Sequence, residues 1–209
     1  HLDFRRQRQM CIRDRFNDDI SQWNVSGVED MSSLFRETDF NGDISTWDVS
    51  NVDEMDYMFH NNKIFNSDIS GWDVSSVEKM NNMFWHAESF SGDISSWNVS
   101  TLETMNNMFM YTFNFTSDLS SWDVSNVSNM NNAFYSSAFN SDISTWNVSG
   151  VTKFSAMFRH CTNFNQDISS WDVSAATTFK TMFEGTNSLS AENRWLSHTS
   201  LSTQTENWF

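Results

Sequence analysis

Acidic side chains recur along this chain at a spacing that could hold cations. An aspartate opens each of seven copies of a phrase that reads DISTWDVSNVDEM at residues 43–55. These aspartates are Asp19, Asp43, Asp68, Asp93, Asp118, Asp142 and Asp167. Parallel stacking of the copies would bring neighbouring carboxylates within about 5 Å of one another, and carboxylate oxygens are ligands for calcium. A column of calcium sites is therefore one interpretation of the pattern.

An Asx-type turn is the other interpretation, and we favour it. In this turn each carboxylate accepts a hydrogen bond from the backbone N–H two residues on, at the serine of DIS. The sequence lacks the glycine-rich GGxGxDxUx spacing of calcium-binding β-helices. We therefore predict a structural aspartate column, with no metal and no cofactor.

Catalytic constellations are not evident among the other reactive side chains. His60, His86 and His160 fall in different copies, and the last two are three copies apart, which is about 15 Å at strand spacing. They cannot share a metal ion. No histidine recurs beside a candidate nucleophile and no glycine-rich phosphate loop is present. The sequence predicts a protein that is not an enzyme.

Composition excludes further classes of function. The 209 residues are 38% hydrophobic and 15% aromatic, which is too rich for a disordered polymer. The formal net charge of −15 would be repelled by phosphate backbones and anionic lipid, so we expect no nucleic-acid binding. No apolar run reaches the roughly 18 residues of a membrane span, so we expect no direct membrane insertion. The chain begins without Met or a signal peptide and is expected to be an excerpt of something longer.

Internal repeats decide the architecture that must position all these residues. Seven units of 24 or 25 residues open at Phe16, Phe40, Phe65, Phe90, Phe115, Phe139 and Phe164. A tryptophan keeps the same phase in each unit, at Trp23, Trp47, Trp72, Trp97, Trp122, Trp146 and Trp171. A fixed period of this length is typical of a solenoid. We predict a solenoid over 16–188 and a decayed repeat or C-terminal cap over 189–209, opened by Leu189.

The leader, residues 1–15, shares nothing with the repeats. Its stretch RQRQMCIRDR resembles translated adaptor read-through, a contaminant of assembled sequences. We therefore treat the leader as a sequence artefact and draw no structural or functional inference from it.

Each unit is predicted to contain a short strand and then a helical turn. Ile44, Trp47 and Val49 include an alternating pair, as in a strand with one buried face. Residues 52, 55, 58 and 59 are apolar at spacings of three and four, which indicates one face of a short helix or 3₁₀ turn. The tryptophans share the phase of the buried strand residues. We therefore place the tryptophan column in the core rather than on a surface that stacks on sugar rings.

A serine separates the predicted strand from the predicted helix. In four units an acidic residue follows it at the third position, which is the spacing of a capping box. We predict that seven serines are helix N-caps: Ser26, Ser50, Ser75, Ser100, Ser125, Ser149 and Ser174.

The repeat phrase resembles a known family. The pattern IxxWxV, followed by SNVxxMxxMF and a loop ending FNxDI, is similar to the leucine-rich repeats of BspA-like surface proteins. It is especially similar to the bacterial surface-protein repeat of about 26 residues in mycoplasma-type lipoproteins. The resemblance implies a right-handed leucine-rich-repeat-like solenoid at a cell surface or in the extracellular space. It also implies a role in adhesion, and it supplies no catalytic residues.

This chain departs from that family at two points. Trp, Val, Met and Phe replace the usual leucines, and the asparagine of ordinary leucine-rich repeats is missing. The curvature and any asparagine ladder therefore do not follow from the resemblance.

The loops after each helical phenylalanine carry the differences between units. Trp85, Tyr111 and Tyr135 fall at the first or second position after that phenylalanine in three consecutive units. Stacking would set them in a row about 5 Å apart per repeat. The same phases hold Arg36, Arg159, His86 and His160, and aromatic residues with Arg are enriched at binding hot spots. The other interpretation is that these side chains only cover helix ends and neighbouring loops.

Three functions follow from these alternatives. The first is adhesion, or binding of a protein or glycan on another cell or matrix, through the exposed loops. The second is a passive spacer or stalk in a larger surface protein. The third is a water- or ice-ordering face of Ser, Thr, Asp and Asn side chains.

Overall fold

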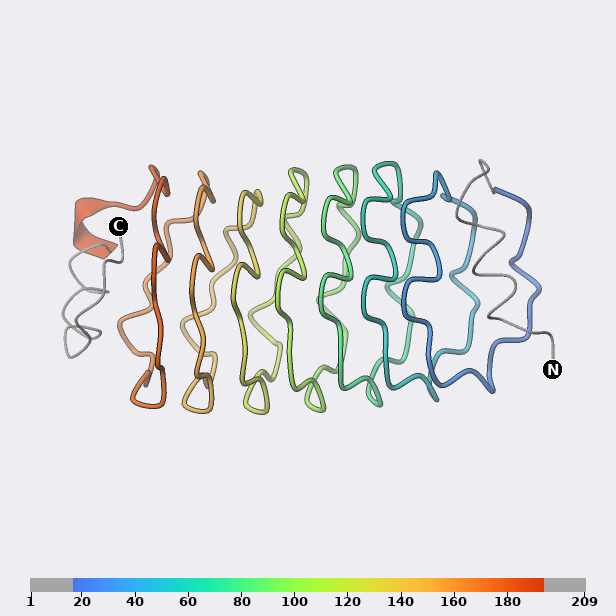
Figure 1. Ribbon diagram of the computed structural model, residues 1–209, viewed down its shortest axis with the longest axis horizontal. Helices are drawn as coiled ribbons and strands as arrows, with labels where there is room; N and C mark the ends of the chain where they lie inside the picture. The colour runs from blue at the N-terminus through green and yellow to red at the C-terminus, as the bar shows by residue number, and fades with distance from the viewer. Residues whose placement is uncertain (1–16, 194–209) are drawn as a thin grey trace.

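The computed structural model describes residues 17–193, so the leader, Phe16 and residues 194–209 of the predicted terminal unit lie outside the described residues. Over the described part, the chain forms similar coils placed side by side along the longest axis (Figure 1). The coils follow one another in chain order, with residue 17 near one end and residue 193 near the other (Figure 1). The molecule is a tandem repeat in space as well as in sequence.

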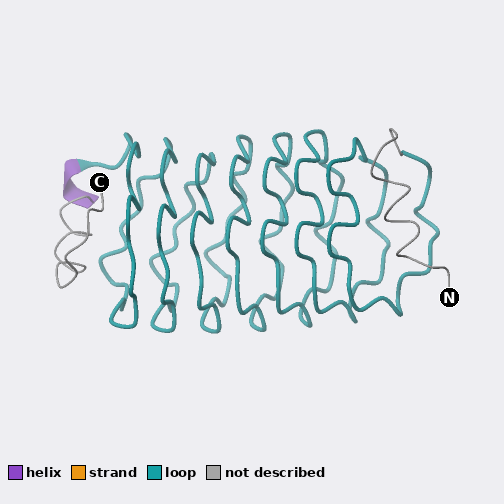
Figure 2. Ribbon diagram, viewed as in Figure 1, coloured by secondary structure: helices purple, strands orange, loops and turns teal. Residues whose placement is uncertain are grey.

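Regular helices and strands are almost absent from residues 17–193. The structure has one short helix at 191–193, and its parallel pairings are isolated bridges rather than strands. These bridges join each repeat to the next through Asp30, Glu54, Lys79, Thr104, Asn129, Lys153 and Thr178 in order. Turns and loops accordingly make up nearly the whole described chain (Figure 2).

The segment predicted as a helical turn is a ladder between repeats. Alternate N–H groups donate to the next repeat, as from Tyr57 to the Asn81 carbonyl at 2.9 Å and from Phe59 to the Met83 carbonyl at 2.8 Å. The N–H between them turns back locally, from Met58 to the Met55 carbonyl at 3.2 Å. A helix cannot form here because half of its N–H groups are already bonded to the neighbouring coil. Tyr57 also has a φ of 61°, which lies outside the helical region.

The predicted strand is replaced by a tight turn. The Trp47 N–H donates to the Ile44 carbonyl at 3.2 Å, and the same turn recurs in every described repeat. The burial pattern was nevertheless predicted correctly. Ile44, Trp47 and Val49 are all buried, and so are the four apolar residues at 52, 55, 58 and 59. Spacings of three and four therefore indicated which side chains point inward, although the backbone that presents them is not helical.

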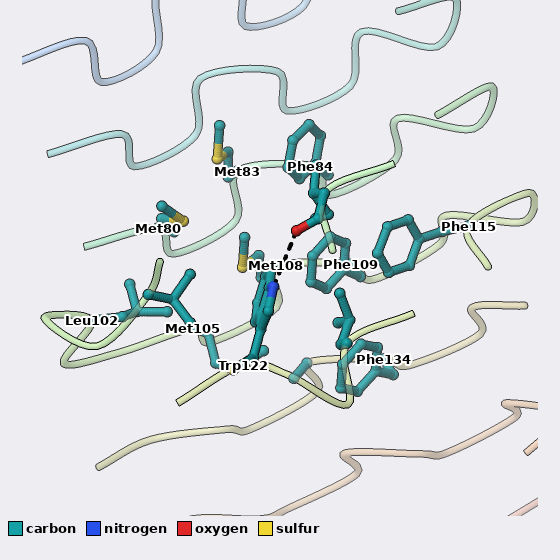
Figure 3. Packing of buried hydrophobic residues seen from close by; sticks show 14 of the residues in the cluster. Met80, Met83, Phe84, Leu102, Met105, Met108, Phe109, Phe115, Trp122 and Phe134 are labelled. Carbon is teal, nitrogen blue, oxygen red and sulfur yellow. Dashed lines mark hydrogen bonds between the residues drawn. The ribbon is translucent and has the colours of Figure 1, made fainter. Parts of the chain in front are cut away.

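The tryptophan column lies in the core, as predicted. Six of its members are each 3 or 4% exposed: Trp47, Trp72, Trp97, Trp122, Trp146 and Trp171. Trp23, in the first described coil, is partly buried and packs against the same core. Each of the six donates its indole Nε1–H to a carbonyl of the preceding repeat at 2.9–3.1 Å, as Trp122 does to Ile94 (Figure 3). The indole thus fills the core and ties two repeats together.

Phenylalanine rings form the second component of the core. The inner phenylalanine of a unit stacks on the phenylalanine that opens the next unit at 3.7–4.2 Å between centroids, as Phe109 does with Phe115. The inner ring of each pair also stacks on its counterparts in neighbouring units at 5.5–5.8 Å. Figure 3 shows this line of rings through Phe84, Phe109 and Phe134. Offset stacking of this kind stabilises aromatic pairs beyond their burial.

The Asp43-type column forms the predicted Asx turns. In all seven copies the aspartate Oδ1 accepts the N–H of the DIS serine at 2.8–3.0 Å. At Asp43, this bond from Ser45 is the main reason that the pKa lies below its ordinary value. The neighbouring Asp19 and Asp68 carboxylates act against it and raise the pKa. The turn therefore favours the ionised form of Asp43 despite the like charges beside it.

The predicted serine caps are wrong, because no helix follows them. Each of the seven serines instead donates its backbone N–H to the Asp or Asn side chain two residues earlier at 3.0–3.3 Å. At Ser50 the hydroxyl also donates to Asp48, at 2.6 Å. The Asx turn is therefore used twice in each repeat. The Asp and Asn acceptors of this second turn are exposed, as the sequence predicts.

An asparagine ladder is present, but at a different position in the repeat from that of ordinary leucine-rich repeats. Its residue follows the phenylalanine that opens each unit, so that Asn41 accepts the Asn66 N–H at 2.7 Å and Asn66 accepts the Ser91 N–H at 2.8 Å. The same bond returns from Asn165 to Asn140 and from Ser190 to Asn165. The FN pair of the repeat phrase was the sequence signal for this ladder.

The indole hydrogen bond leads to a stability prediction. Trp97→Phe keeps an aromatic ring in the core but removes one of two donors to the Ile69 carbonyl, which still accepts the Trp72 N–H at 3.2 Å. We expect the free energy of unfolding to fall by about 2–3 kcal/mol in urea titrations, because the core loses one hydrogen bond and the smaller ring leaves a cavity. Met105→Leu, which conserves volume at an equally buried position, should cost about 1 kcal/mol or less. Equal losses in the two variants would contradict the role given to the indole N–H.

The Asx turns lead to a prediction about acid and metal. Bonds from Ser70 lower the pKa of Asp68, so this contribution to stability is present above the ordinary value of 3.8 and is lost as pH falls below it. Asp68→Ala should lower the melting temperature at pH 7, whereas Asp68→Asn, which keeps the Oδ1 acceptor, should leave it near that of the parent. EDTA should change neither. A melting temperature that EDTA lowers and calcium alone restores would favour the calcium interpretation.

Candidate functional site

One edge of the stacked coils carries a continuous series of aromatic and cationic side chains. We call this series the edge row, and its members are Arg36, Tyr57, His60, Trp85, His86, Tyr111, Tyr135, Arg159 and His160. Most of them occupy the first or second position after the inner phenylalanine of a repeat, where the ladder between coils ends. They are neighbours because the ladder keeps all the coils in register.

Ring contacts run along the edge row without a break in its middle. Trp85 lies 4.5 Å from His60 and 6.1 Å from His86, measured between ring centroids. His86 stacks on Tyr111 at 4.3 Å, and Tyr111 meets Tyr135 edge to face at 5.3 Å. The structure therefore brings the predicted Tyr111 and Tyr135 into contact, and His86 connects Trp85 to them.

The two arginines lie at opposite ends of the edge row. Arg36 is 5.4 Å from the ring centroid of Tyr57, and Arg159 is 5.6 Å from that of Tyr135. His160 joins the second end, edge to face with Tyr135 at 5.7 Å. Arg159 and His160 thus belong with the predicted tyrosines, whereas Arg36 is linked to Trp85 only through Tyr57 and His60.

Three relevant aromatic residues were not predicted. His60 is only 9% exposed and joins Tyr57 to Trp85. Phe113 is 51% exposed and its ring centroid lies 6.1 Å from that of Tyr111. The phase of Trp85 and Tyr135 includes His60, so a search of that phase for all aromatic rings would have found it. Tyr57 and Phe113 occupy other phases, and only their contacts identify them.

Backbone conformation at the edge row is unusual for such large side chains. His86, Tyr111 and His160 have φ values of 59°, 60° and 55°, in the left-handed region. This region is disfavoured for residues with a Cβ and is tolerated best by Gly and Asn. Asn61 and Gly185 occupy the same phase in other repeats with φ values of 54° and 73°. The chain therefore places rings at positions where the backbone favours smaller residues.

Polar groups without partners gather at the same edge. Six buried side-chain nitrogen or oxygen atoms in residues 17–193 have no hydrogen-bond partner, and four belong to the edge row. They are His60 Nδ1, Trp85 Nε1, His86 Nδ1 and Arg159 Nε. The inner tryptophans, by contrast, all donate to carbonyls. Four unpartnered buried atoms in one row of side chains require an explanation, because nearly all buried polar groups in proteins are hydrogen-bonded.

Burial holds His60 and His86 of the edge row neutral. Burial, with a smaller contribution from the Arg36 charge, lowers the pKa of His60 to about 4. Burial also lowers the pKa of His86, although the Glu88 carboxylate 3.9 Å away acts in the opposite direction. The middle of the row is therefore aromatic and uncharged near neutral pH.

Two surface hollows are lined by residues within 17–193, and neither has the ligands of a metal centre. The first, of about 510 Å³, is lined by Thr116, Asp118, Ser120, Asn140, Ser141 and Asp142. The Asp118 carboxylate already accepts hydrogen bonds from Ser120 and Ser141, and the Asp142 carboxylate accepts one from Ser144. Over residues 17–193 no group of three His, Cys, Asp or Glu side chains could hold a metal ion.

The second hollow adjoins the edge row. It has a volume of about 260 Å³ and is lined by Phe113, Ser136, Ser137, Ala138, His160, Thr162 and Asn163. Five of these seven residues have a polar side chain, and Phe113 supplies a large exposed ring. The hollow can hold a small group against an aromatic face.

The low pKa of His60 leads to a prediction. Because the folded pKa of about 4 lies below the ordinary 6.5, the unfolded chain takes up this proton first as pH falls. His60 should therefore reduce stability progressively between pH 6.5 and 4. His60→Met, which introduces the residue found at the same phase in Met110, should flatten the melting temperature over this interval. Equal pH dependence in parent and variant would contradict the buried neutral imidazole.

Comparison with known proteins identifies a family. No helix in residues 17–193 has the length and apolar character needed to cross a membrane. No curated protein and no solved structure matches the chain. The profile of the family described as "Mycoplasma protein of unknown function, DUF285" matches twice, over residues 5–122 and 111–209. The two matches together span nearly the whole sequence, and the chain belongs to this family of mycoplasma-type repeats.

Proposed function

We propose that the chain is a non-catalytic repeat domain of a BspA-like surface protein, and that it binds a protein or glycan on another cell or matrix through the edge row. The proposal includes a right-handed leucine-rich-repeat-like solenoid and a location at the cell surface or in the extracellular space. The resemblance of the repeat phrase to BspA-like proteins supports both the solenoid fold and the extracellular location.

One observation carries the proposal: unsatisfied polar groups and large, partly exposed rings coincide at the positions that differ most between repeats. Elsewhere in the repeat, side chains are committed to the architecture, as the indole bonds and Asx turns illustrate. At the edge row, Trp85 and His86 keep buried nitrogen atoms without partners. Residues that depart from local structural rules are typical of functional sites.

The chemistry of the edge row suits binding rather than catalysis. Aromatic rings provide large contact areas that lose little side-chain entropy on binding. Arg159 adds a planar donor group, and it is oriented by Glu184 at 2.7 Å. These groups resemble the aromatic and Arg anchors on which protein interfaces depend.

The spacer is the second candidate, and the ion pairs of the edge favour it. Arg36 pairs with Glu37 at 3.1 Å and Lys63 with Glu88 at 2.7 Å, so part of the edge satisfies its own charges. A stalk needs only such internal pairing and a repeated core. The spacer predicts that the rings of the edge row can be replaced without loss of any interaction.

The water- or ice-ordering face gains less support from the geometry. The hydroxyls of Thr46, Ser96 and Ser121 already donate to carbonyls of the preceding repeat. A donor that is bonded within the chain is not available to order water.

Substitution along the edge row tests the binding proposal. The triple variant Trp85→Met, Tyr111→Asn, Tyr135→Met introduces residues that the chain itself uses at the same phases, at Met110 and Asn61. Asn also suits the left-handed backbone of residue 111. We expect a melting temperature near that of the parent, but loss of retention on whichever immobilised mucin, matrix extract or glycan array retains the parent.

A matched triple variant provides the control. Asp48→Asn, Asp73→Asn, Asp123→Asn changes three exposed side chains outside the edge row to the residue found at Asn98 and Asn147. It should be retained like the parent. Equal retention of the edge triple and the parent, or a parent that binds nothing across the panel, would favour the spacer.

A further inference from the structure

Phe113 is a side chain that the repeat architecture does not require. It stands four residues after the inner phenylalanine of its unit, where the other described units have Asp39, Lys63, Glu88, Ala138, Thr162 and Asn187. Phe113 is 51% exposed, so its ring is not part of the core. The other described units fold without an aromatic ring at this position, so the exposed ring is not needed for the repeat structure.

The neighbouring side chains turn this ring into one wall of a site. The hollow of about 260 Å³ continues from Phe113 across Ser136, Ser137 and Ala138 to His160, Thr162 and Asn163. These residues come from three consecutive repeats, so the stacking of the coils creates the hollow. Side chains from separate coils face a common space that no single repeat contains.

The far wall of the hollow is held in place. The His160 ring occupies the space that a Cβ on residue 185 would fill, so Gly185 makes room for it. Tyr135 contacts the same ring edge to face at 5.7 Å. Asn163 is fixed by a bond from its Nδ2 to the Ala138 carbonyl at 3.3 Å. Preorganised walls of this kind reduce the entropy lost on binding.

Charge around the hollow disfavours an ionic ligand. Its lining contains no Asp, Glu, Lys or Arg. The nearby Arg159 is already paired with Glu184 at 2.7 Å, and the chain as a whole carries a charge of −15. An anionic ligand would therefore meet general repulsion and no unpaired cation in the lining, whereas a cationic ligand would find no carboxylate there.

The remaining chemistry is that of an uncharged, hydroxyl-rich ring. A pyranose presents polarised C–H groups on one face, which complement the negative face of an aromatic ring, and hydroxyls around its rim. Phe113 supplies the aromatic face, and Ser136, Thr162 and Asn163 supply hydroxyl and amide groups. The volume of about 260 Å³ lies below the roughly 300–1,000 Å³ of sites for drug-sized ligands, so it suits one monosaccharide unit.

We infer that this hollow is a binding site for a neutral glycan, with one pyranose unit stacked on Phe113. The inference rests on the proposed binding function and specifies the class of ligand at one end of the edge row. The rest of the glycan would extend along the tyrosines, since Phe113 is 6.1 Å from Tyr111, which contacts Tyr135.

Direct titration with defined saccharides tests the inference. The full chain is mixed with cellohexaose, N-acetylchitohexaose or mannohexaose, and with a heparin hexasaccharide as the acidic probe. Binding is followed by calorimetry and saturation-transfer difference NMR. We expect at least one neutral hexasaccharide to bind with a Kd of about 1 mM or tighter, and Phe113→Ala to weaken it about tenfold.

Two further variants separate the site from general surface effects. Ile64→Ala removes the other large apolar side chain that is exposed within residues 17–193; it is 46% exposed and outside the hollow, and its removal should leave binding unchanged. His160→Asn, which introduces the residue used at Asn61, suits the left-handed backbone and should weaken binding without unfolding the chain. Failure of all three neutral saccharides to bind, binding of heparin alone, or equal affinity of Phe113→Ala and the parent would overturn the inference.

The outcome is distinguishable from that of the broader proposal. The edge triple variant leaves Phe113, His160 and Asn163 unchanged. If the parent is retained on a matrix protein and the edge triple is not, while no neutral saccharide binds, the binding function stands and the glycan inference fails. If no neutral saccharide binds and the parent is not retained on any matrix protein, the binding function and the glycan inference both fail.

Discussion

Hydrogen bonds between neighbouring coils are the constraint on which the rest of the structure depends. Alternate backbone N–H groups donate to the next repeat, as from Phe84 to the Met108 carbonyl at 2.9 Å, and each inner indole donates to the repeat before it. An isolated coil would leave these groups without partners and its rings exposed. Cooperation between nearest neighbours is the usual origin of stability in repeat proteins. Core positions are consequently apolar in every unit, whereas the edge row differs between units in size, charge and aromatic content.

The sequence predicted what is buried better than it predicted the backbone. The common phase of Trp47 and Phe59 identified the core, because a side chain that stacks on its counterparts must recur at a fixed period. The spacing of Met55, Met58 and Phe59 was interpreted as helical, yet turns that alternate with inter-repeat bonds bury the same positions. Ser50 was misassigned for a related reason. Its spacing to residue 53 fits a capping box, but Asp48 lies two residues before it and accepts its bonds.

The sequence predicted the candidate site only at the first two positions after the inner phenylalanine of each repeat. Trp85, Tyr111 and Tyr135 were expected to lie in a row, and Tyr111 and Tyr135 do touch. The contacts that join different phases of adjacent coils, such as Tyr135 with His160, depend on the offset between those coils. Sequence spacing does not contain that offset. The hollow beside Phe113 is a further example, because three repeats contribute to its lining.

Native-state hydrogen exchange would test the dependence of each coil on its neighbours most directly. The account predicts that the amides of Tyr57, Phe59, Phe84 and Phe109, which donate across repeats, exchange together through one cooperative opening of the central coils. Amides that turn back within their own coil, such as those of Met58 and Met83, should open in the same event. Independent exchange of single repeats, with the local turns protected more strongly than the inter-repeat ladder, would contradict it.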